Sequence, residues 1–180
     1  MVFIHLATGF EEVEALTCVD VLRRGGADAL MVSVTGEKTV TGAHGIRVEA
    51  DVLFEEADYG FCEMIVLPGG MPGATNLRDH EGLTAQIKDF ASAGKPLAAI
   101  CAAPLALAAH GALEGKKATI YPGMEEYLTG ATPTGDDVTV DGNVITGKGP
   151  ALAMEFALQL VETLRGRKVK EDVAKGLLVK

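Results

Sequence analysis

Residues 2–24 read VFIHLATGFEEVEALTCVDVLRR, and their pattern decides the fold. The first part, Val2–Ala7, is a short, mainly apolar run that ends at Thr8-Gly9, as expected for a strand buried on both faces. Glu11–Arg24 follows with apolar residues near helical spacing and stops at Gly25-Gly26, which predicts a helix. A buried strand that passes through a glycine turn into a helix is the repeating unit of an α/β fold.

The same alternation continues along the rest of the chain. Apolar runs predict further strands at 29–34, 64–67 and 97–100, and helical spacing predicts helices at about 84–93, 104–109, 151–164 and 169–174. Two hairpins are expected, one among the glycines of 36–45 and one about Asp141-Gly142. The sequence therefore predicts a mostly parallel central sheet with helices on both faces, in a single domain over residues 1–180.

Composition and charge exclude several classes of protein. Lys+Arg 16 against Asp+Glu 25 gives a net charge of −9, which disfavours binding to nucleic acid or to an anionic membrane. Hydrophobic residues make up 48% and charged residues 23%, so the chain is not disordered. Cys18, Cys62 and Cys101 form no CxxC pair, which argues against a disulfide framework and against a metal site. Without a basic leader or a long apolar stretch, we expect a cytoplasmic protein in a reducing compartment.

Cys101 is the strongest candidate for chemistry. Ligands of α/β sheets bind where strands end and turn into helices, and Cys101 follows one predicted strand and precedes a helix. The positive end of that helix would favour the thiolate, and the N–H of the small Ala102 would face a developing oxyanion. The alternative is a buried core cysteine, which is the commoner fate of a free cysteine.

Two further turns lie at the same predicted edge. Glu14 stands in the first turn of the first helix, where acids usually serve the helix dipole, but a protonated carboxyl group there would donate a hydrogen bond to a thiolate. Gly69 and Gly70 leave backbone N–H groups open to a ligand, as half of an oxyanion site, or they form a turn only. The GxGxxG and GxxxxGK[ST] patterns are missing from these turns, so no nicotinamide, ATP or other cofactor is predicted.

Histidine, the usual partner of a nucleophilic cysteine, is scarce in this sequence. His110 lies nine residues after Cys101, which places it on the opposite side of a shared helix. His5 lies within the first strand, and His44 and His80 lie in a hairpin and at a helix start. None of the four is an obvious base, so a carboxyl group is expected to move any proton.

Taken together, these residues resemble the ThiJ/PfpI superfamily, and specifically the branch of the parkinsonism-associated protein deglycase and its bacterial relatives. The resemblance runs from about residue 2 to 179, and four stretches carry it: LATGFEEVEALTCVDVLRRGG (6–26), MIVLPGGMPGATNLRD (64–79), LAAICAAPLALAAHGALEGKKAT (97–119) and GKGPALAMEFALQLVETLRGR (147–167). It implies a flavodoxin-like three-layer sandwich, a homodimer and no cofactor or metal.

The resemblance also implies roles for individual residues. Cys101 is similar in position to the family's reactive cysteine, and Glu14 to the protonated glutamate that hydrogen-bonds its sulfur. The other implied site residues are Gly69, Gly70 and Ala102 in the oxyanion site, Arg24 and His44 in an anion pocket near the dimer interface, and Tyr121, Gly149 and Pro150 in the surrounding pocket. His44 stands where an arginine is typical. Residues 168–180 resemble a C-terminal helix and tail that partly cover the site.

The implied function is a cofactor-independent glyoxalase or deglycase, a hydrolase- or lyase-type enzyme. It would act on methylglyoxal or on early glycation adducts of amino groups and thiols. Relatives carry a histidine-proline motif where this chain has Tyr121-Pro122, so slow turnover is expected. Peptidase and amidotransferase relatives use histidines that this sequence lacks. The alternatives are a non-catalytic oxidative-stress sensor or redox-regulated chaperone using the same cysteine, and a scaffold whose site has decayed.

Overall fold

The structure is a computed structural model that describes residues 1–179, and its centre is a seven-stranded sheet. The strand order is β10-β11-β7-β6-β1-β2-β5, and all neighbours are parallel except the β10–β11 pair. The bounds are β1 (Val2–Leu6), β2 (Ala29–Ser33), β5 (Val52–Leu53), β6 (Met64–Leu67), β7 (Leu97–Ile100), β10 (Val138–Asp141) and β11 (Val144–Gly147). The predicted mostly parallel sheet is confirmed.

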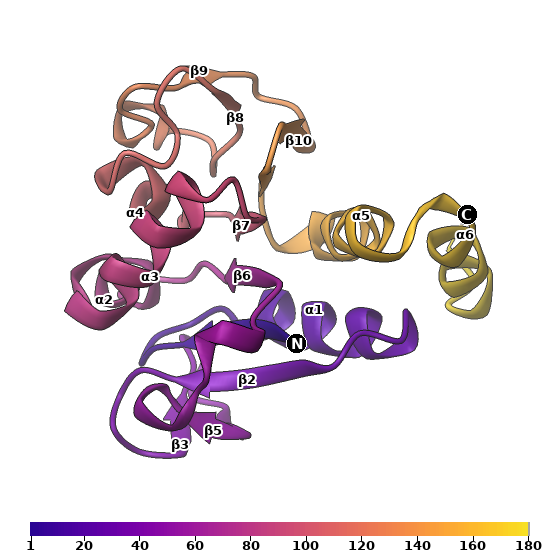
Figure 1. The fold of residues 1–180 in the computed structure, drawn as a ribbon, viewed down its shortest axis with the longest axis horizontal. Coiled ribbons are helices and arrows are strands. Elements are labelled where there is room, and N and C mark those ends of the chain that lie inside the picture. The colour runs from indigo at the N-terminus through magenta and orange to yellow at the C-terminus, as the bar shows by residue number, and fades with distance from the viewer. Residues whose placement is uncertain (180) are drawn as a thin grey trace.

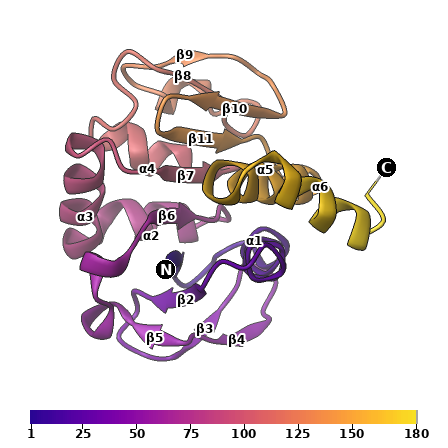
Figure 2. The same cartoon turned by 45° about the vertical axis from the view of Figure 1, so that its right-hand side comes forward.

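Helices cover both faces of this sheet (Figures 1 and 2). One layer contains α1 (Glu12–Arg24), α5 (Ala153–Arg165) and α6 (Arg167–Gly176), and the other contains α2 (Gly73–Asp79), α3 (Glu81–Ser92) and α4 (Pro104–Ala109). Side chains alternate along a strand, so Ile4 and Leu6 pack under α1 and α5 while Phe3 packs on the opposite face. The fold is the flavodoxin-like three-layer α/β sandwich.

Both expected hairpins are present. The first, β3 (Thr39–Thr41) with β4 (Arg47–Glu49), forms a separate two-stranded sheet, and the second, β10 with β11, joins the central sheet. Three elements are too short for a pattern to show: β5 at the edge of the central sheet, and β8 (Lys117–Ala118) and β9 (Thr132–Pro133), which pair with each other. Single-turn 3₁₀ helices lie at Phe54–Glu56, Tyr59–Phe61, Glu125–Tyr127 and Pro150–Leu152.

The sequence patterns missed α2 and misplaced the start of α3. The helix α2 begins at Gly73, directly after the Pro68–Pro72 segment, whose glycines and prolines indicate a turn. The helix α3 begins at Glu81, three residues before the predicted 84, because the side chain of His80 accepts a hydrogen bond from the Leu83 N–H and caps it.

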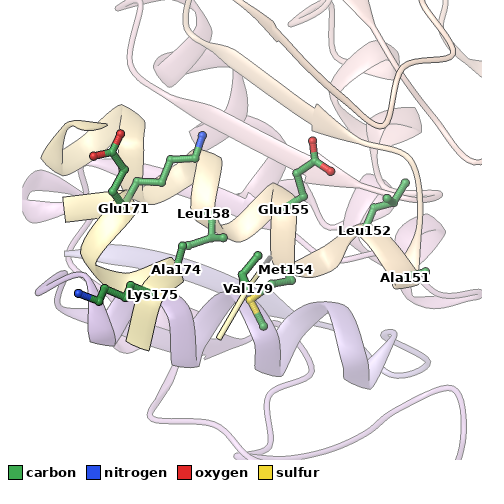
Figure 3. A pocket seen from close by; sticks show the side chains of 10 residues that line it. Ala151, Leu152, Met154, Glu155, Leu158, Glu171, Ala174, Lys175 and Val179 are labelled. Carbon is green, nitrogen blue, oxygen red and sulfur yellow. The ribbon is translucent and has the colours of Figure 1, made fainter. Parts of the chain in front are cut away.

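The helix α6 packs against α5 near the C-terminus. Between them lies a cavity of about 670 Å³, which the tail residue Val179 also lines (Figure 3). The prediction that residues 168–180 partly cover the candidate site stays a prediction, and Lys180 lies outside the described residues. No helix within residues 1–179 combines the length and the apolar character needed to cross a bilayer.

Candidate functional site

Cys101 occupies a sharp turn between β7 and α4. Its φ of 61° lies in the left-handed region, where residues other than glycine are uncommon and strained. Two backbone hydrogen bonds hold this conformation: the Cys101 N–H donates to the Gly147 carbonyl (2.9 Å), and the Cys101 carbonyl accepts from the Tyr121 N–H (2.9 Å). The residue is 8% exposed, so a small ligand has limited access to the sulfur.

Glu14 lies across Gly69 from this cysteine. Its side chain is fully buried, and its Oε2 accepts a hydrogen bond from the Gly69 N–H at 2.7 Å. A Cβ added to Gly69 would lie 2.7 Å from Cys101 Cβ and 2.8 Å from Glu14 Oε2, so both side chains lie close to this glycine. Only a residue without a side chain fits beside the acid and the cysteine.

The other oxygen of Glu14, Oε1, is buried and accepts no hydrogen bond from a backbone N–H in the part of the chain that the structure describes. The Cys101 thiol nevertheless acts on the carboxyl group through a hydrogen bond that lowers the pKa of Glu14. Because a buried polar atom normally has a partner, we take the unpartnered oxygen as the one that faces the sulfur.

Burial dominates the electrostatics of this pair. It raises the pKa of Glu14 to about 7, against hydrogen bonds from Gly69 and Cys101 that lower it. Burial and the Glu14 carboxylate raise the pKa of Cys101 to about 12. Hydrogen bonds from the N–H groups of Ala102 and Gly70 have the opposite effect and lower this pKa, but they are weaker. The two groups titrate as a pair, so one proton leaves near neutrality and the second is held into the alkaline range.

This result differs from the expectation that a helix terminus favours the Cys101 thiolate. The helix α4 is only 6 residues long, so its dipole is weak. Desolvation and the neighbouring Glu14 carboxylate both oppose a negative charge on the sulfur. A thiolate at Cys101 is compatible with the structure when Glu14 holds the remaining proton. The protonated carboxyl group then donates a hydrogen bond to the sulfur, whereas the carboxylate would repel it.

Gly70 presents its N–H to the sulfur and cannot carry a side chain. Its φ is 86°, and a Cβ would lie 2.5 Å from both the Glu11 nitrogen and the Gly9 carbonyl oxygen. The Ala102 N–H acts on the sulfur from the other side. The structure thus places the backbone donors of Gly70 and Ala102 beside Cys101, while the N–H of Gly69 is used to hold Glu14.

We expect Gly70→Ala to destabilise the fold by about 1–3 kcal/mol more than Gly26→Ala. Gly26 has a similar φ of 74° but nothing within 4 Å of an added Cβ, so it reports the backbone strain alone, roughly 1–2 kcal/mol. Urea unfolding of both variants measures the difference. Equal losses in the free energy of unfolding would show that the contact of Gly70 with Gly9 and Glu11 has no energetic consequence.

A cavity of about 250 Å³ opens beside the sulfur. Its lining residues are Gly70, Met71, Cys101, Ala102, Tyr121 and Met124. The larger cavity beside α6 is lined by no cysteine or histidine, so we take the smaller one, which contains Cys101, as the candidate site. Gly149 lies in contact distance of the Tyr121 ring, since an added Cβ would be 3.6 Å from Cδ2. Met71 and Met124 were not predicted; Met71 belongs to the turn already singled out, and nothing in the sequence marks Met124.

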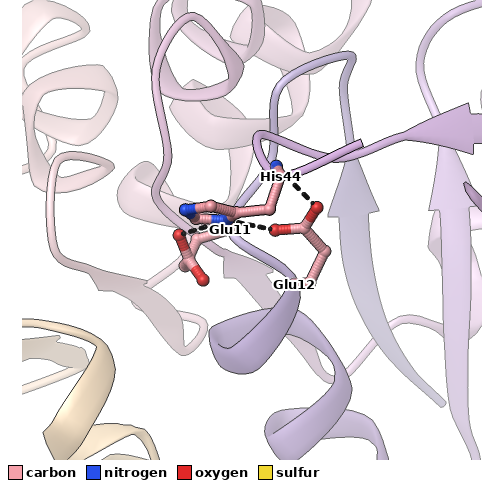
Figure 4. Close-up of side chains that lie close together, drawn as sticks. All are labelled: Glu11, Glu12 and His44. Atoms are coloured by element: carbon pink, nitrogen blue, oxygen red, sulfur yellow. Dashed lines mark hydrogen bonds and ion pairs between the residues drawn. The ribbon is translucent and has the colours of Figure 1, made fainter. Parts of the chain in front are cut away.

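The remaining predicted residues lie outside this cavity. His44 lies between Glu11 and Glu12 at the start of α1 (Figure 4). A third cavity, which Pro150 also lines, lies next to it. Arg24 lies at the other end of α1, about 18 Å away by helix rise, where it pairs with Asp20 at 2.8 Å. A single chain therefore does not bring Arg24 and His44 together.

Glu11, Glu12 and His44 offer ligand atoms within 4.8 Å of one another. The oxygens of Glu12 are already used, however: Oε1 accepts from the backbone N–H of His44 at 2.8 Å, and Oε2 contacts His44 Nδ1 at 2.8 Å. These contacts account for the cluster as an anchor between α1 and the hairpin turn, and we assign no metal to it.

The histidines have structural partners away from Cys101. His5 is buried and its Nε2 lies 2.7 Å from the Tyr59 hydroxyl; burial lowers its pKa to about 3. His80 caps α3, and His110 Nε2 donates to the Arg78 carbonyl at 2.8 Å. Glu14 is the ionisable side chain that acts on the sulfur, and Tyr121 lines the cavity beside it.

Comparison with known proteins gives consistent matches. The model of the DJ-1/PfpI family matches residues 1–163. Protein dj-1beta of Drosophila melanogaster is 38% identical over 97% of this chain and 94% of its own length, and a Caenorhabditis elegans protein named glutathione-independent glyoxalase DJR-1.2 is 34% identical over 93% and 89%. A solved structure described as Toxoplasma gondii DJ-1, oxidized, has a TM-score of 0.94 at 38% identity and covers 98% of this chain and 97% of its own.

Some relatives are much longer. Protein DJ-1 homolog A of Arabidopsis thaliana is 42% identical over 99% of this chain, which spans 46% of that relative.

Proposed function

Because the chain belongs to the DJ-1/PfpI family, we propose that it is a glutathione-independent glyoxalase that acts on methylglyoxal or on early glycation adducts. The observation that carries the proposal is the Cys101–Gly69–Glu14 arrangement, in which a strained cysteine and a buried acid flank one glycine at the mouth of a small cavity. The name of the nematode relative supports the same reaction.

The first step is attack of the Cys101 sulfur on the aldehyde carbon. A C–S bond forms, the carbonyl π electrons move to oxygen, and the backbone N–H groups of Gly70 and Ala102 are the nearest donors for that oxygen. Glu14 supplies a proton to the oxygen and completes a hemithioacetal. The pKa of Glu14 near 7 suits this role, because the group then holds a proton and can release it.

The second step moves a hydrogen between the two carbons of the adduct. The Glu14 carboxylate removes the proton from the former aldehyde carbon, giving an enediolate, and returns it to the neighbouring carbon, while the hydroxyl proton moves from the oxygen of the former aldehyde carbon to the oxygen of the former ketone carbon. This leaves a thioester of lactate on Cys101. Water then cleaves the C–S bond, so that methylglyoxal plus one water gives lactate and the free thiol. No redox cofactor is needed, because one carbon is oxidised as the other is reduced.

The purified protein is expected to convert methylglyoxal to an equal amount of lactate without glutathione. Exposed Tyr121 borders the cavity instead of a histidine, so turnover should be slow. The measurement is enzymatic detection of lactate alongside loss of methylglyoxal, and glycated amino acids serve as second substrates for the deglycase reaction. Loss of methylglyoxal without lactate would indicate simple adduct formation on the protein and would rule out the proposal.

An oxidative-stress sensor is the second candidate function. It is supported by the solved relative described as oxidized and by the position of Cys101, which is the most accessible of the three buried cysteines. Burial raises the pKa of all three thiols, to about 11 for Cys62 and about 12 for Cys101, so accessibility and the neighbouring acid, not the pKa, single out Cys101. Neither Cys18 nor Cys62 has an acid that can share a proton with it across one glycine.

Mild peroxide is therefore expected to oxidise Cys101 to sulfenic and sulfinic acid before either other cysteine. Peptide mass spectrometry over a time course measures the order. Earlier oxidation of Cys18 or Cys62 would remove the sensor role from this site.

The proposal also includes a homodimer in the cytoplasm. Exposed apolar side chains gather near the start of α1 and the neighbouring hairpin turn, namely Val13 (54%), Leu16 (40%) and Ile46 (53%), and a second copy would cover them. A reducing compartment fits three cysteines that are all free. Light scattering of the purified protein reports the mass of the assembly.

A further inference from the structure

The turn that carries His44 is anchored to α1 by one buried carboxylate. Glu12 is 4% exposed, and its Oε1 accepts from the backbone N–H groups of His44 (2.8 Å) and Ile46 (3.4 Å). Its Oε2 contacts His44 Nδ1 at 2.8 Å, and Glu11 Oε2 lies 3.5 Å from the same nitrogen (Figure 4). The imidazole is thus held between two acids while most of the residue faces solvent.

The same helix start contacts the reactive pair through its backbone. The Glu11 N–H donates to the Gly69 carbonyl at 2.9 Å, and the Gly69 N–H donates to Glu14 Oε2 at 2.7 Å. The charge of Glu11 also raises the pKa of Glu14. Two peptide groups and one carboxylate therefore connect the His44 cluster to the acid beside Cys101.

Few charged groups surround His44, Glu12 and Glu14. His44 faces Glu11 and Glu12, whose hydrogen bond and charges raise its pKa. Burial alone would raise the pKa of Glu12, but hydrogen bonds from the side chain and backbone of His44 and from Ile46 lower it overall. Glu14 is affected by Glu11 and Cys101, and it in turn raises the pKa of Cys18.

We propose that His44 is a positioning residue whose charge is sensed by the Glu14–Cys101 pair through Glu11 and Glu12, so that the reactivity of Cys101 depends on the protonation of a side chain outside the cavity. Protonated His44 compensates the two acids at the start of α1. When His44 loses its proton, the charge of Glu11 acts on Glu14 without compensation, and the pair retains its shared proton to higher pH. The inference rests on the proposed function only in taking Cys101 as the reactive group.

The test is the rate of Cys101 alkylation by iodoacetamide across the neutral range, followed by peptide mass spectrometry. Three proteins are compared: the wild type, His44→Arg, which keeps the positive charge at all pH values, and His44→Gln, which never carries it. We expect a lower midpoint of reactivity for His44→Arg than for His44→Gln, with rates that differ by about two- to fivefold near the midpoint. The wild type should follow His44→Arg in acid and His44→Gln in alkali.

The outcomes separate the roles. Superimposed profiles for the three proteins overturn the inference. A shift in both variants alike also overturns it, because a purely structural role would not be rescued by the charged variant. The assay contains no methylglyoxal, so an inactive glyoxalase with shifted alkylation profiles would contradict the proposed function and leave this inference supported.

Discussion

Replacing Cys101 with serine is expected to lower kcat/KM for methylglyoxal by a factor on the order of 10³ or more. A serine hydroxyl ionises far less readily than a thiol, and none of the histidines among residues 1–179 lies in the cavity to remove its proton. Glu14 cannot take that role alone, because its pKa near 7 is far below that of an alcohol. The measurement is the initial rate of lactate formation without glutathione.

Cys62→Ser is the matched control for this variant. Cys62 is also buried, and its thiol donates to the Met64 carbonyl at 3.2 Å, a bond that a hydroxyl preserves. We expect this control to keep its activity within about twofold, as for a change outside the reacting groups. If Cys101→Ser kept a tenth of the wild-type rate, or if both variants lost activity alike, the sulfur of Cys101 would not be the nucleophile.

Glu14→Gln is expected to lower kcat by about 10²–10⁴-fold, the usual contribution of a positioned acid or base. The amide oxygen of glutamine can still accept from the Gly69 N–H, so the geometry is preserved while the transferable proton is lost. Folding stability should not fall, because an amide avoids the cost of burying a carboxylate near neutral pH. Thermal unfolding of the variant confirms that the loss lies in the chemistry.

The pH profile separates this role from simple packing. The wild-type kcat/KM should rise near pH 7 as the pair loses its first proton and leaves a protonated Glu14 beside a thiolate, and Glu14→Gln should lose that inflection. Glu155→Gln, which changes an exposed acid on α5, is the control and should keep the wild-type profile. An unchanged inflection in Glu14→Gln would assign the pH dependence to another group.

The sequence predicted the layers of the fold because they depend on local patterns. The strands at 64–67 and 97–100 have the predicted bounds, because each is a short apolar run with a glycine and proline turn at one end. The helix α2 was missed because it begins within a segment rich in turn residues, where its buried side chains, such as Leu77, gain stability only from tertiary packing.

The candidate site was predictable in its members and less so in its electrostatics. Cys101, Glu14 and Gly70 could be singled out because each follows the end of a central parallel strand. The strength of desolvation at Cys101 depends on how completely the layers close over the sulfur, which no local pattern encodes. The same holds for His44, whose contact with Glu12 joins positions 32 residues apart.

The charge on the Cys101 sulfur near neutral pH decides whether this residue is an activated nucleophile. The thiolate absorbs in the ultraviolet, so the difference in absorbance between the wild type and Cys101→Ser reports the charge on this sulfur as the pH is raised. Taken singly, pKa values of about 7 for Glu14 and about 12 for Cys101 would place the first negative charge on Glu14. The proposed function requires the opposite distribution, so we expect thiolate absorbance to appear near pH 7 while Glu14 keeps the remaining proton of the pair. If the absorbance first appears near pH 12, the negative charge resides on Glu14 at neutral pH and Cys101 is not an activated nucleophile.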